Sequence, residues 1–268
     1  MTVLHAIVLG LVQGLTEFLP VSSSGHLILV PKLLGWPDQG LGFDAMVHFG
    51  TALAAIYHFR TDCHALARSL FMRSSDAATI ALRNAIIIGS VPAVLAALLF
   101  HKAIDAYARN VTLVAVNLIV WAIIMLFADY RASKANKTTA ETPAPKPGSA
   151  FAIGAAQAMA LLPGTSRSGA SISAGILTGQ SRSSAVRFSF LLGLPIIVMS
   201  SLVASIEMFS AAANGGLSMA PLWWGLITSF VGGVLAIRVL LRFVEQRALT
   251  YFAAYRIALA LFILFTLR

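Results

Sequence analysis

The stretch GLTEFLPVSSSGHLILV, residues 14–30, places polar side chains inside an otherwise apolar segment. It holds one carboxylate (Glu17), three consecutive hydroxyls (residues 22–24) and one imidazole (His26) among leucine, valine and isoleucine. Burying such groups costs free energy unless they are paired with one another. Ionisable side chains in an apolar, membrane-like segment therefore indicate a functional site.

The composition of the whole chain predicts an integral membrane protein. Of its 268 residues 58% are hydrophobic and only 11% are charged, and its mean hydropathy is +0.84. A soluble domain carries roughly a quarter charged residues. The net charge of +9 does not indicate a nucleic-acid partner, because the basic residues cluster in loops that flank apolar spans. The single cysteine, Cys63 in a predicted polar loop, excludes an intrachain disulfide.

Apolar stretches of two lengths follow one another along the chain. A membrane-spanning helix needs about 20 apolar residues, and six stretches are predicted to span: 43–59, 79–100, 110–128, 187–206, 221–241 and 250–267. The stretches 2–19, 21–34, 149–162 and 169–178 are shorter or broken by proline and glycine, with polar residues at each junction. They predict two re-entrant helix pairs, which enter the bilayer and return to the same face.

The two re-entrant pairs resemble each other in sequence. With a shift of 144 residues, AIVLGLVQGLTEFLPVSSSGH (6–26) falls on AFAIGAAQAMALLPGTSRSGA (150–170). The aligned identities include Gln13 with Gln157, Ser22 with Ser166, Ser24 with Ser168, and Gly25 with Gly169. We therefore predict an all-α membrane protein of two repeats, each with one re-entrant pair and three spans, in residues 1–128 and 149–268. Residues 129–148, rich in Ala, Thr, Lys and Pro, are predicted as a flexible cytoplasmic linker.

An odd number of spans per repeat inverts the second repeat relative to the first. The charges agree, because loops 60–83, 129–148, 180–187 and 242–247 then place twelve Lys and Arg residues in the cytoplasm. Both termini would be extracytoplasmic. Inverted repeats with broken helices place a polar site near the middle of the membrane, between the two halves.

In the first half, Gln13 and Glu17 lie four residues apart and therefore on one face of a helix. Their oxygens suit a divalent cation such as Mg²⁺ or Ca²⁺, or Glu17 acts as a general acid or base. The alternative is that Glu17 only caps the re-entrant turn.

The serines after Glu17 precede an apolar helix. Hydroxyls at a helix start cap its free N–H groups, and the same geometry binds phosphate oxygens. A serine beside an imidazole is also typical of an activated nucleophile. Because His26 lies three residues after Ser23, we expect contact between them within a helical turn. The alternative is that His26 is only a hydrogen-bonded interior side chain.

The second half carries PGTSRSGAS, residues 163–171. Arg167 there sits at membrane depth, which costs at least about 2.5–3.5 kcal/mol, and its planar fork of donors suits phosphate. The alternative is a purely structural ion pair with Glu17. The predicted substrate-binding set is Ser22, Ser24, Gly25, Thr165, Ser166 and Ser168.

Together these groups suit phosphoryl transfer, which depends on positioning and on stabilising negative charge. Since lipid-facing helices surround the site, the substrate would be a phosphate on a lipid. A transporter of such a lipid is the competing class, but it has no use for a nucleophile. Other polar side chains near the spans are interpreted as interhelical hydrogen-bonding groups that could also support the site: Asp44, His48, Asn84 and Asn117.

QGLTEFLPVSSSGHL followed by LLPGTSRSGAS resembles the bacterial undecaprenyl-pyrophosphate phosphatases, the bacitracin-resistance family. Its marks are an [E/Q]-x-x-x-E pair running into F-L-P-[VI]-S-S-[ST]-G-H and a later P-G-x-S-R-S. The resemblance covers the whole chain in motif order, spacing and size. This chain has Gln13 at the first acidic position, which moves the acid–base role onto Glu17.

The resemblance implies hydrolysis of a C55 isoprenyl diphosphate to the monophosphate, which recycles the carrier lipid of peptidoglycan synthesis. It implies a multi-pass protein of the bacterial cytoplasmic (inner) membrane, a divalent cation, and a site open to the periplasm. On the matching positions it implies catalytic roles for Glu17, Ser23, His26 and Arg167, and metal binding by Gln13 and Glu17. The sequence leaves the oligomeric state open, a homodimer included, and leaves open whether Ser23 or His26 is the nucleophile.

Overall fold

A computed structural model describes residues 1–71, 76–107, 109–134, 144–216, 218–246 and 249–266. These residues form helices and no strand, as the sequence predicts. The helices are α1 (Val3–Phe18), α2 (Ser23–Leu34), α3 (Gly40–His58), α4 (Arg60–Phe71), α5 (Ala77–Tyr107), α6 (Val111–Lys134), α7 (Pro147–Met159), α8 (Arg167–Leu177), α9 (Arg182–Ala213), α10 (Met219–Gln246) and α11 (Thr250–Thr266).

Four of these helices, α5, α6, α9 and α10, are long and apolar enough to cross a membrane. They make the chain a multi-pass membrane protein. The other two predicted spans correspond to α3 and α11, and neither meets that criterion. α11 has only 17 residues, and α3 carries Asp44 and His48 on the side that contains the site described below.

The predicted polar loop that begins at residue 60 is a helix in the structure. α4 runs from Arg60 to Phe71, and its half-buried Cys63 and Leu66 pack against the main hydrophobic core. An ion pair of 2.5 Å between Asp62 and Arg187 ties α4 to α9. The segment is therefore an amphipathic helix, whose apolar positions were masked in sequence by the charges between them.

The predicted linker 129–148 is helical at both of its ends. α6 continues to Lys134 and α7 begins at Pro147, while residues 135–143 of the predicted linker lie outside the described residues. Buried Asp129 explains the longer α6, because it pairs with Arg182 at 2.6 Å and accepts a hydrogen bond from Thr250 at 2.9 Å. α9 and α10 also extend into the predicted loops 180–187 and 242–247, which are therefore shorter than predicted.

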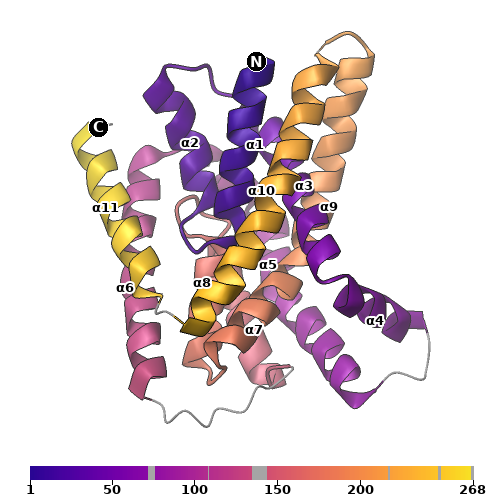
Figure 1. Cartoon of the computed structure of the whole chain (residues 1–268), viewed down its shortest axis with the longest axis vertical. Coiled ribbons are helices and arrows are strands. Elements are labelled where there is room, and N and C mark those ends of the chain that lie inside the picture. Colours follow the sequence, from indigo (N-terminus) through magenta and orange to yellow (C-terminus); the bar gives the residue numbers. More distant parts are fainter. Residues whose placement is uncertain (72–75, 108, 135–143, 217, 247–248, 267–268) are drawn as a thin grey trace.

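Short helices pack along long helices from the other half of the chain. α1 packs along α10 and α7 packs along α5 (Figure 1). At both contacts the backbones touch. A Cβ on Gly10 would lie 2.5 Å from the Gly225 carbonyl oxygen, and one on Gly154 would lie 2.0 Å from that of Gly89. Glycine at these positions permits the close approach that membrane helix pairs use.

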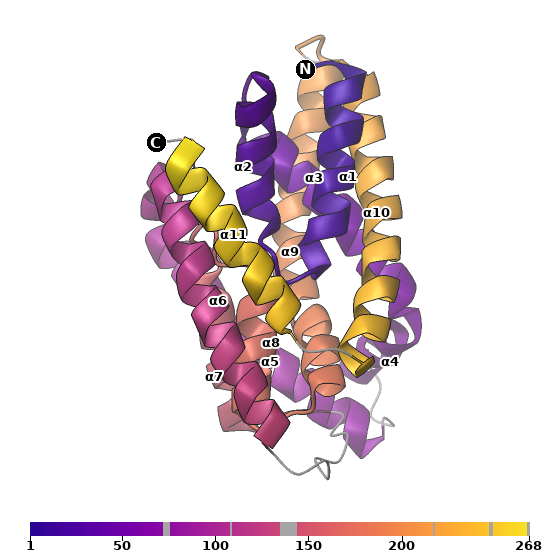
Figure 2. The same ribbon diagram turned by 60° about the vertical axis from the view of Figure 1, so that its left-hand side comes forward.

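The two helix–break–helix segments meet in the middle of the molecule. α1 and α2 occupy the end that carries both termini, and α7 and α8 lie toward the opposite end (Figures 1 and 2). α6 packs against α11 and α8, and α9 packs against α3 and α8. The breaks between α1 and α2 and between α7 and α8 are thus enclosed by the long helices.

Candidate active site

The two breaks have the same backbone geometry. Ser22 precedes α2 with φ of 73°, and Ser166 precedes α8 with φ of 70°. Among the described residues they are the two non-glycine positions with positive φ. The Ser22 hydroxyl accepts from the Gly25 N–H and that of Ser166 from the Gly169 N–H. Such strained conformations cost about 1–3 kcal/mol each and cluster at functional sites.

A fully buried arginine, Arg256 of α11, holds both breaks together. Its guanidinium donates to the carbonyl oxygen of Pro20 in the first break (3.3 Å) and to those of Gly164 and Thr165 in the second (both 2.9 Å). It also donates to two carbonyls of α6, and Asn117 of α6 donates to the carbonyl of Pro163 at 2.8 Å. These donors satisfy backbone carbonyls that a broken helix leaves free within the membrane.

The sequence reasoning missed Arg256. The available signal was an arginine inside a predicted span, 250–267, which is a rare and costly placement. For Asn117, we expected a hydrogen bond to another helix, whereas its acceptor is the carbonyl of Pro163 in the break between α7 and α8.

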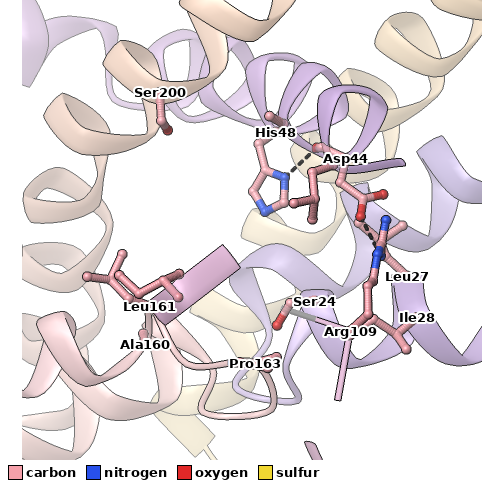
Figure 3. A pocket seen from close by; sticks show the side chains of 13 residues that line it. Ser24, Leu27, Ile28, Asp44, His48, Arg109, Ala160, Leu161, Pro163 and Ser200 are labelled. Atoms are coloured by element: carbon pink, nitrogen blue, oxygen red, sulfur yellow. Dashed lines mark hydrogen bonds and ion pairs between the residues drawn. The ribbon is translucent and has the colours of Figure 1, made fainter. Parts of the chain in front are cut away.

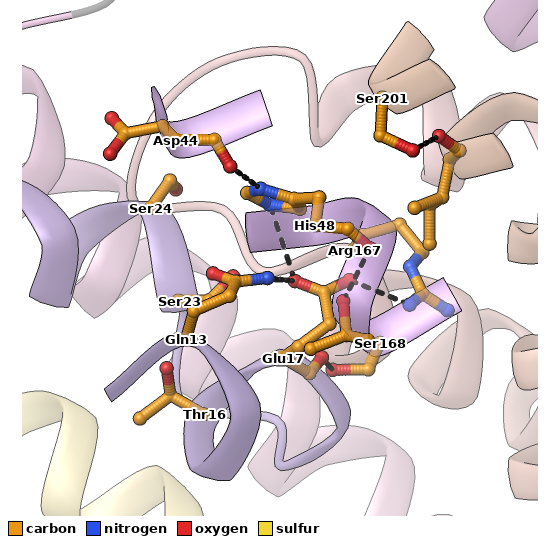
Figure 4. A network of polar contacts seen from close by, with 12 residues as sticks. Gln13, Thr16, Glu17, Ser23, Ser24, Asp44, His48, Arg167, Ser168 and Ser201 are labelled. Atoms are coloured by element: carbon orange, nitrogen blue, oxygen red, sulfur yellow. Dashed lines mark hydrogen bonds and ion pairs between the residues drawn. The ribbon is translucent and has the colours of Figure 1, made fainter. Parts of the chain in front are cut away.

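The carboxylate of Glu17 is the centre of the polar network (Figure 4). Its Oε1 accepts from Arg167 Nη2 at 2.7 Å, and its Oε2 accepts from Ser23 Oγ at 2.7 Å and from Gln13 Nε2 at 3.1 Å. Glu17 is only 6% exposed. The structure therefore brings together four of the residues that the sequence singled out, from α1, α2 and α8.

Arg167 begins α8 and is held from two sides. Besides Glu17, its Nη1 donates to the carbonyl oxygen of Ser189 in α9 at 3.2 Å. A Cβ on Gly193 would lie 2.5 Å from the same nitrogen, so this glycine makes room for the guanidinium. Arg167 Nε is buried without a hydrogen-bond partner, so its N–H is free to donate to a ligand.

His48 of α3 completes the network from a third direction. Its Nε2 lies 3.4 Å from Glu17 Oε2, and its Nδ1 lies 2.6 Å from the carbonyl oxygen of Asp44. Because a carbonyl only accepts, Nδ1 carries a proton. Our sequence reasoning treated His48 chiefly as an interhelical group and did not include it in the site. The missed signal was its place one turn after Asp44, on the same face of one helix.

His26 does not contact Ser23, contrary to our expectation. Its Nδ1 lies 2.7 Å from the carbonyl oxygen of Ser22, and its Nε2 lies 2.7 Å from the hydroxyl of Tyr255. The reason is local. Ser23 is the first residue of α2, so its hydroxyl faces Glu17 across the break, whereas the His26 ring reaches back one turn along the helix.

The predicted substrate-binding residues divide into three groups. Ser24 and Ser166 line the cavity beside Glu17, while Ser22 and Gly25 form the cap of α2. Ser168 instead donates from its hydroxyl to the carbonyl of Leu19 at 3.1 Å. Thr165 is buried and offers its carbonyl to the arginine of α11. These last two residues hold the breaks together and do not line the cavity.

Two cavities adjoin at this site. The inner one, of about 190 Å³, is lined by polar Glu17, Ser23 and Arg167 and by apolar side chains of α5 and α9. The outer one, of about 370 Å³, shares Ser24 and His48 with it and is otherwise mainly apolar (Figure 3).

Arg109 is a charged residue in the lining of the outer cavity. It pairs with Asp44 and Asp38, both at 2.8 Å. The cavities together give a small polar part and a wider, mainly apolar part whose lining includes one ion pair, Arg109 with Asp44.

The side chains at the site offer few oxygen ligands for a divalent cation. Among the described residues, no group of three or more His, Cys, Asp or Glu side chains could hold a metal ion. Glu17 is the one carboxylate that lines the inner cavity, and the neighbouring Gln13 has a buried Oε1 without a partner. Mg²⁺ is usually bound by one or two carboxylates plus substrate phosphates and water. The residues therefore fit a cation shared with a phosphate ligand, and they do not form a protein-only cage.

Fold and site together define a multi-pass helical membrane protein with a carboxylate, a hydroxyl and a guanidinium meeting between two helix breaks. A family model described as bacitracin resistance protein BacA matches residues 6–262. The chain belongs to this family, as the resemblance of its two motifs indicated.

Several curated relatives of the chain are named undecaprenyl-diphosphatase. The chain is 40% identical to an undecaprenyl-diphosphatase of Trichlorobacter lovleyi, over 96% of this chain and 94% of that protein. It is 40% identical to one from Marinobacter nauticus, over 97% of both chains, and 36% identical to one from Campylobacter curvus, over 99% of both.

Proposed function

We propose that this protein hydrolyses undecaprenyl diphosphate to undecaprenyl phosphate and inorganic phosphate. Its family and the name of its curated relatives support this reaction. The observation that carries it is the contact of 2.7 Å between Ser23 Oγ and the Glu17 carboxylate, with Arg167 on the other carboxylate oxygen. The proposed hydrolysis recycles the carrier lipid for cell-wall synthesis and accounts for bacitracin resistance.

In this proposal Ser23 is the nucleophile and Glu17 is its general base. The serine oxygen attacks the terminal phosphorus while its proton passes to Glu17 Oε2, and the bond from phosphorus to the bridging oxygen breaks. Undecaprenyl phosphate leaves, and water then cleaves the phosphoserine to give inorganic phosphate. Arg167 and the N–H groups at the starts of α2 and α8 stabilise the negative charge on the phosphoryl oxygens.

His26 acts in this proposal by holding the break in place. Its ring joins the Ser22 carbonyl to Tyr255, so it supports the backbone beside the nucleophile. The alternative from the sequence, His26 as the phosphoryl acceptor, is tested by trapping the phosphoenzyme and locating the phosphate by mass spectrometry. Phosphate on Ser23 supports the proposal, and phosphate on His26 contradicts it.

A divalent cation, Mg²⁺ or Ca²⁺, belongs to the same proposal. Glu17 and Gln13 Oε1 would hold it together with the substrate, and it would neutralise phosphate charge. Its support is the Oε1 of Gln13, which is buried without a partner on the same amide whose Nε2 donates to Glu17. The prediction is that EDTA abolishes phosphate release and that Mg²⁺ or Ca²⁺ restores it.

For the architecture, we propose two inverted repeats, 1–128 and 149–268, each with a re-entrant pair and three spans. The matching caps at Ser22 and Ser166 support the repeat, as does the packing of α1 on α10 and of α7 on α5. α3 and α11 would cross as the shorter spans, in a membrane that adapts to short helices at modest cost.

We place the protein in the cytoplasmic (inner) membrane with its site facing the periplasm. The support is the excess of Lys and Arg in the segments 60–83, 129–148, 180–187 and 242–247 of the sequence. All the site residues named here come from one chain, so this proposal does not require a homodimer.

The competing function, transport of an isoprenyl phosphate lipid, needs an arginine and hydroxyls but not a nucleophile beside a base. The test is phosphate release from undecaprenyl diphosphate by the purified protein in detergent. We expect Ser23→Ala and Glu17→Gln to lower kcat by about 10³-fold or more. Ser205→Ala, a buried serine of α9 that bonds only within its helix, is the matched control and should keep wild-type activity. Folded wild type without release, with Mg²⁺ present, would leave transport as the function.

A further inference from the structure

Gln157, in the last turn of α7, has a buried amide without any partner. The residue is 3% exposed, and neither its Nε2 nor its Oε1 forms a hydrogen bond. Leaving a buried donor and acceptor unpaired is destabilising, because both lose their bonds to water. Such a side chain in a native structure needs an explanation.

The amide lies at the inner cavity. Gln157 lines that cavity together with Glu17, Ser23 and Arg167. Its free N–H donors are therefore in the same small space as the nucleophile and the guanidinium. A phosphoryl group placed between Ser23 and Arg167 would bring acceptor oxygens into this space.

The comparison of the two halves explains why the amide is free. Gln157 is the counterpart of Gln13, whose Nε2 donates to Glu17 four residues later. The position four residues after Gln157 is Leu161, which offers no acceptor. The second half thus keeps the amide and lacks its internal partner, so the donor is available to a ligand.

We propose that Gln157 binds the terminal phosphoryl group of the lipid diphosphate, donating from Nε2 to one of its oxygens. This inference rests on the proposed hydrolysis. It adds a binding residue from α7, a helix that otherwise contributes no polar side chain to the described lining of the inner cavity. The same phosphoryl group leaves as inorganic phosphate, so Gln157 also contacts that product.

The test is kinetics of Gln157→Leu on undecaprenyl diphosphate, with inorganic phosphate as a product inhibitor and thermal unfolding as the stability measurement. We expect kcat/KM to fall about 10- to 100-fold, the effect of losing a hydrogen bond to a charged group. The inhibition constant for phosphate should rise by a similar factor. The unfolding midpoint should not fall, because the variant removes unpaired polar atoms from the interior.

Gln180 provides the matched control. It is also a buried glutamine with both amide atoms unpartnered, but it lies between α8 and α9 and lines neither the inner nor the outer cavity. Gln180→Leu should keep kcat/KM and the phosphate inhibition constant. A second variant, Gln157→Glu, keeps the shape and adds a negative charge, so it should raise KM more than Gln157→Leu does.

Wild-type activity of Gln157→Leu would overturn the inference, and so would an unchanged phosphate inhibition constant. A fall in activity matched by a fall in the unfolding midpoint would also overturn it, since that is the result of a structural role. In each case an active wild type leaves the proposed function in place. An inactive wild type would instead contradict the proposed function itself.

Discussion

The break between α1 and α2 and the break between α7 and α8 share a backbone but differ in the charge that they carry. Both contain a serine with φ near 70° that caps the following helix. After the cap, the first break places Ser23 and the second places Arg167; four residues after the paired glutamines, the first half has Glu17 and the second has Leu161. The first half therefore supplies the nucleophile and its base, and the second half supplies the guanidinium.

A pair of similar breaks becomes an asymmetric site because their side chains differ. The shared backbone brings two helix starts together, where N–H groups and dipoles favour an anion. The divergent side chains then compensate each other, because Glu17 and Arg167 pair at 2.7 Å and neither charge is left alone in the interior. Two matching acidic breaks would leave uncompensated charge, which is strongly destabilising when buried.

Among the variants that test the difference between the two breaks, Arg167→Lys is expected to lower kcat/KM the most. The lysine keeps the charge of the second break but has no planar fork, so it cannot contact Glu17, the Ser189 carbonyl and a phosphate together. We expect kcat/KM for undecaprenyl diphosphate to fall about 100-fold. Arg182→Lys is the control, since Arg182 pairs with Asp129 away from both cavities. Retention of wild-type kcat/KM by Arg167→Lys would show that charge alone is sufficient there.

A smaller effect is expected when the second half is given the acid of the first. Leu161→Glu places a carboxylate four residues after Gln157, in the lining of the inner cavity that also contains Arg167. The new charge competes for the guanidinium and repels the diphosphate, so we expect KM to rise about 10-fold. Leu161→Gln, of nearly the same shape and without charge, is the control and should change KM much less. Equal KM values for the two variants would contradict this electrostatic explanation.

Much of this arrangement could be predicted from the sequence, because it depends on local patterns. Gln13, Glu17, Ser23 and Arg167 were identified from spacing and from the cost of placing such groups among apolar residues, and the structure brings them together. Local patterns could not show in which direction a side chain points. Whether the Ser23 hydroxyl faces His26 or Glu17 depends on where α2 begins, and a helix start is defined only to within a few residues by sequence.

Contacts from distant helices were also out of reach. Arg256 and His48 come from α11 and α3, and nothing near them in sequence shows that they meet a break in the middle of the bundle. The extent of α4 and α6 was missed for a related reason. Tertiary ion pairs through Asp62 and Asp129 stabilise helical turns whose composition alone resembles a loop.

The smallest effect is expected from removing the caps, and it tests the shared backbone directly. Ser22→Ala and Ser166→Ala each remove one hydroxyl acceptor from a helix start, which costs about 1 kcal/mol. We expect each to lower the unfolding midpoint by about 2–4 °C. The corresponding glycine variants should lower it less, because glycine adopts positive φ without strain. Equal shifts in the unfolding midpoint at the two positions would show that both breaks depend on their serine caps to the same extent. A much larger shift at one position would show that its break depends on the cap, while the other relies on the bonds from Arg256.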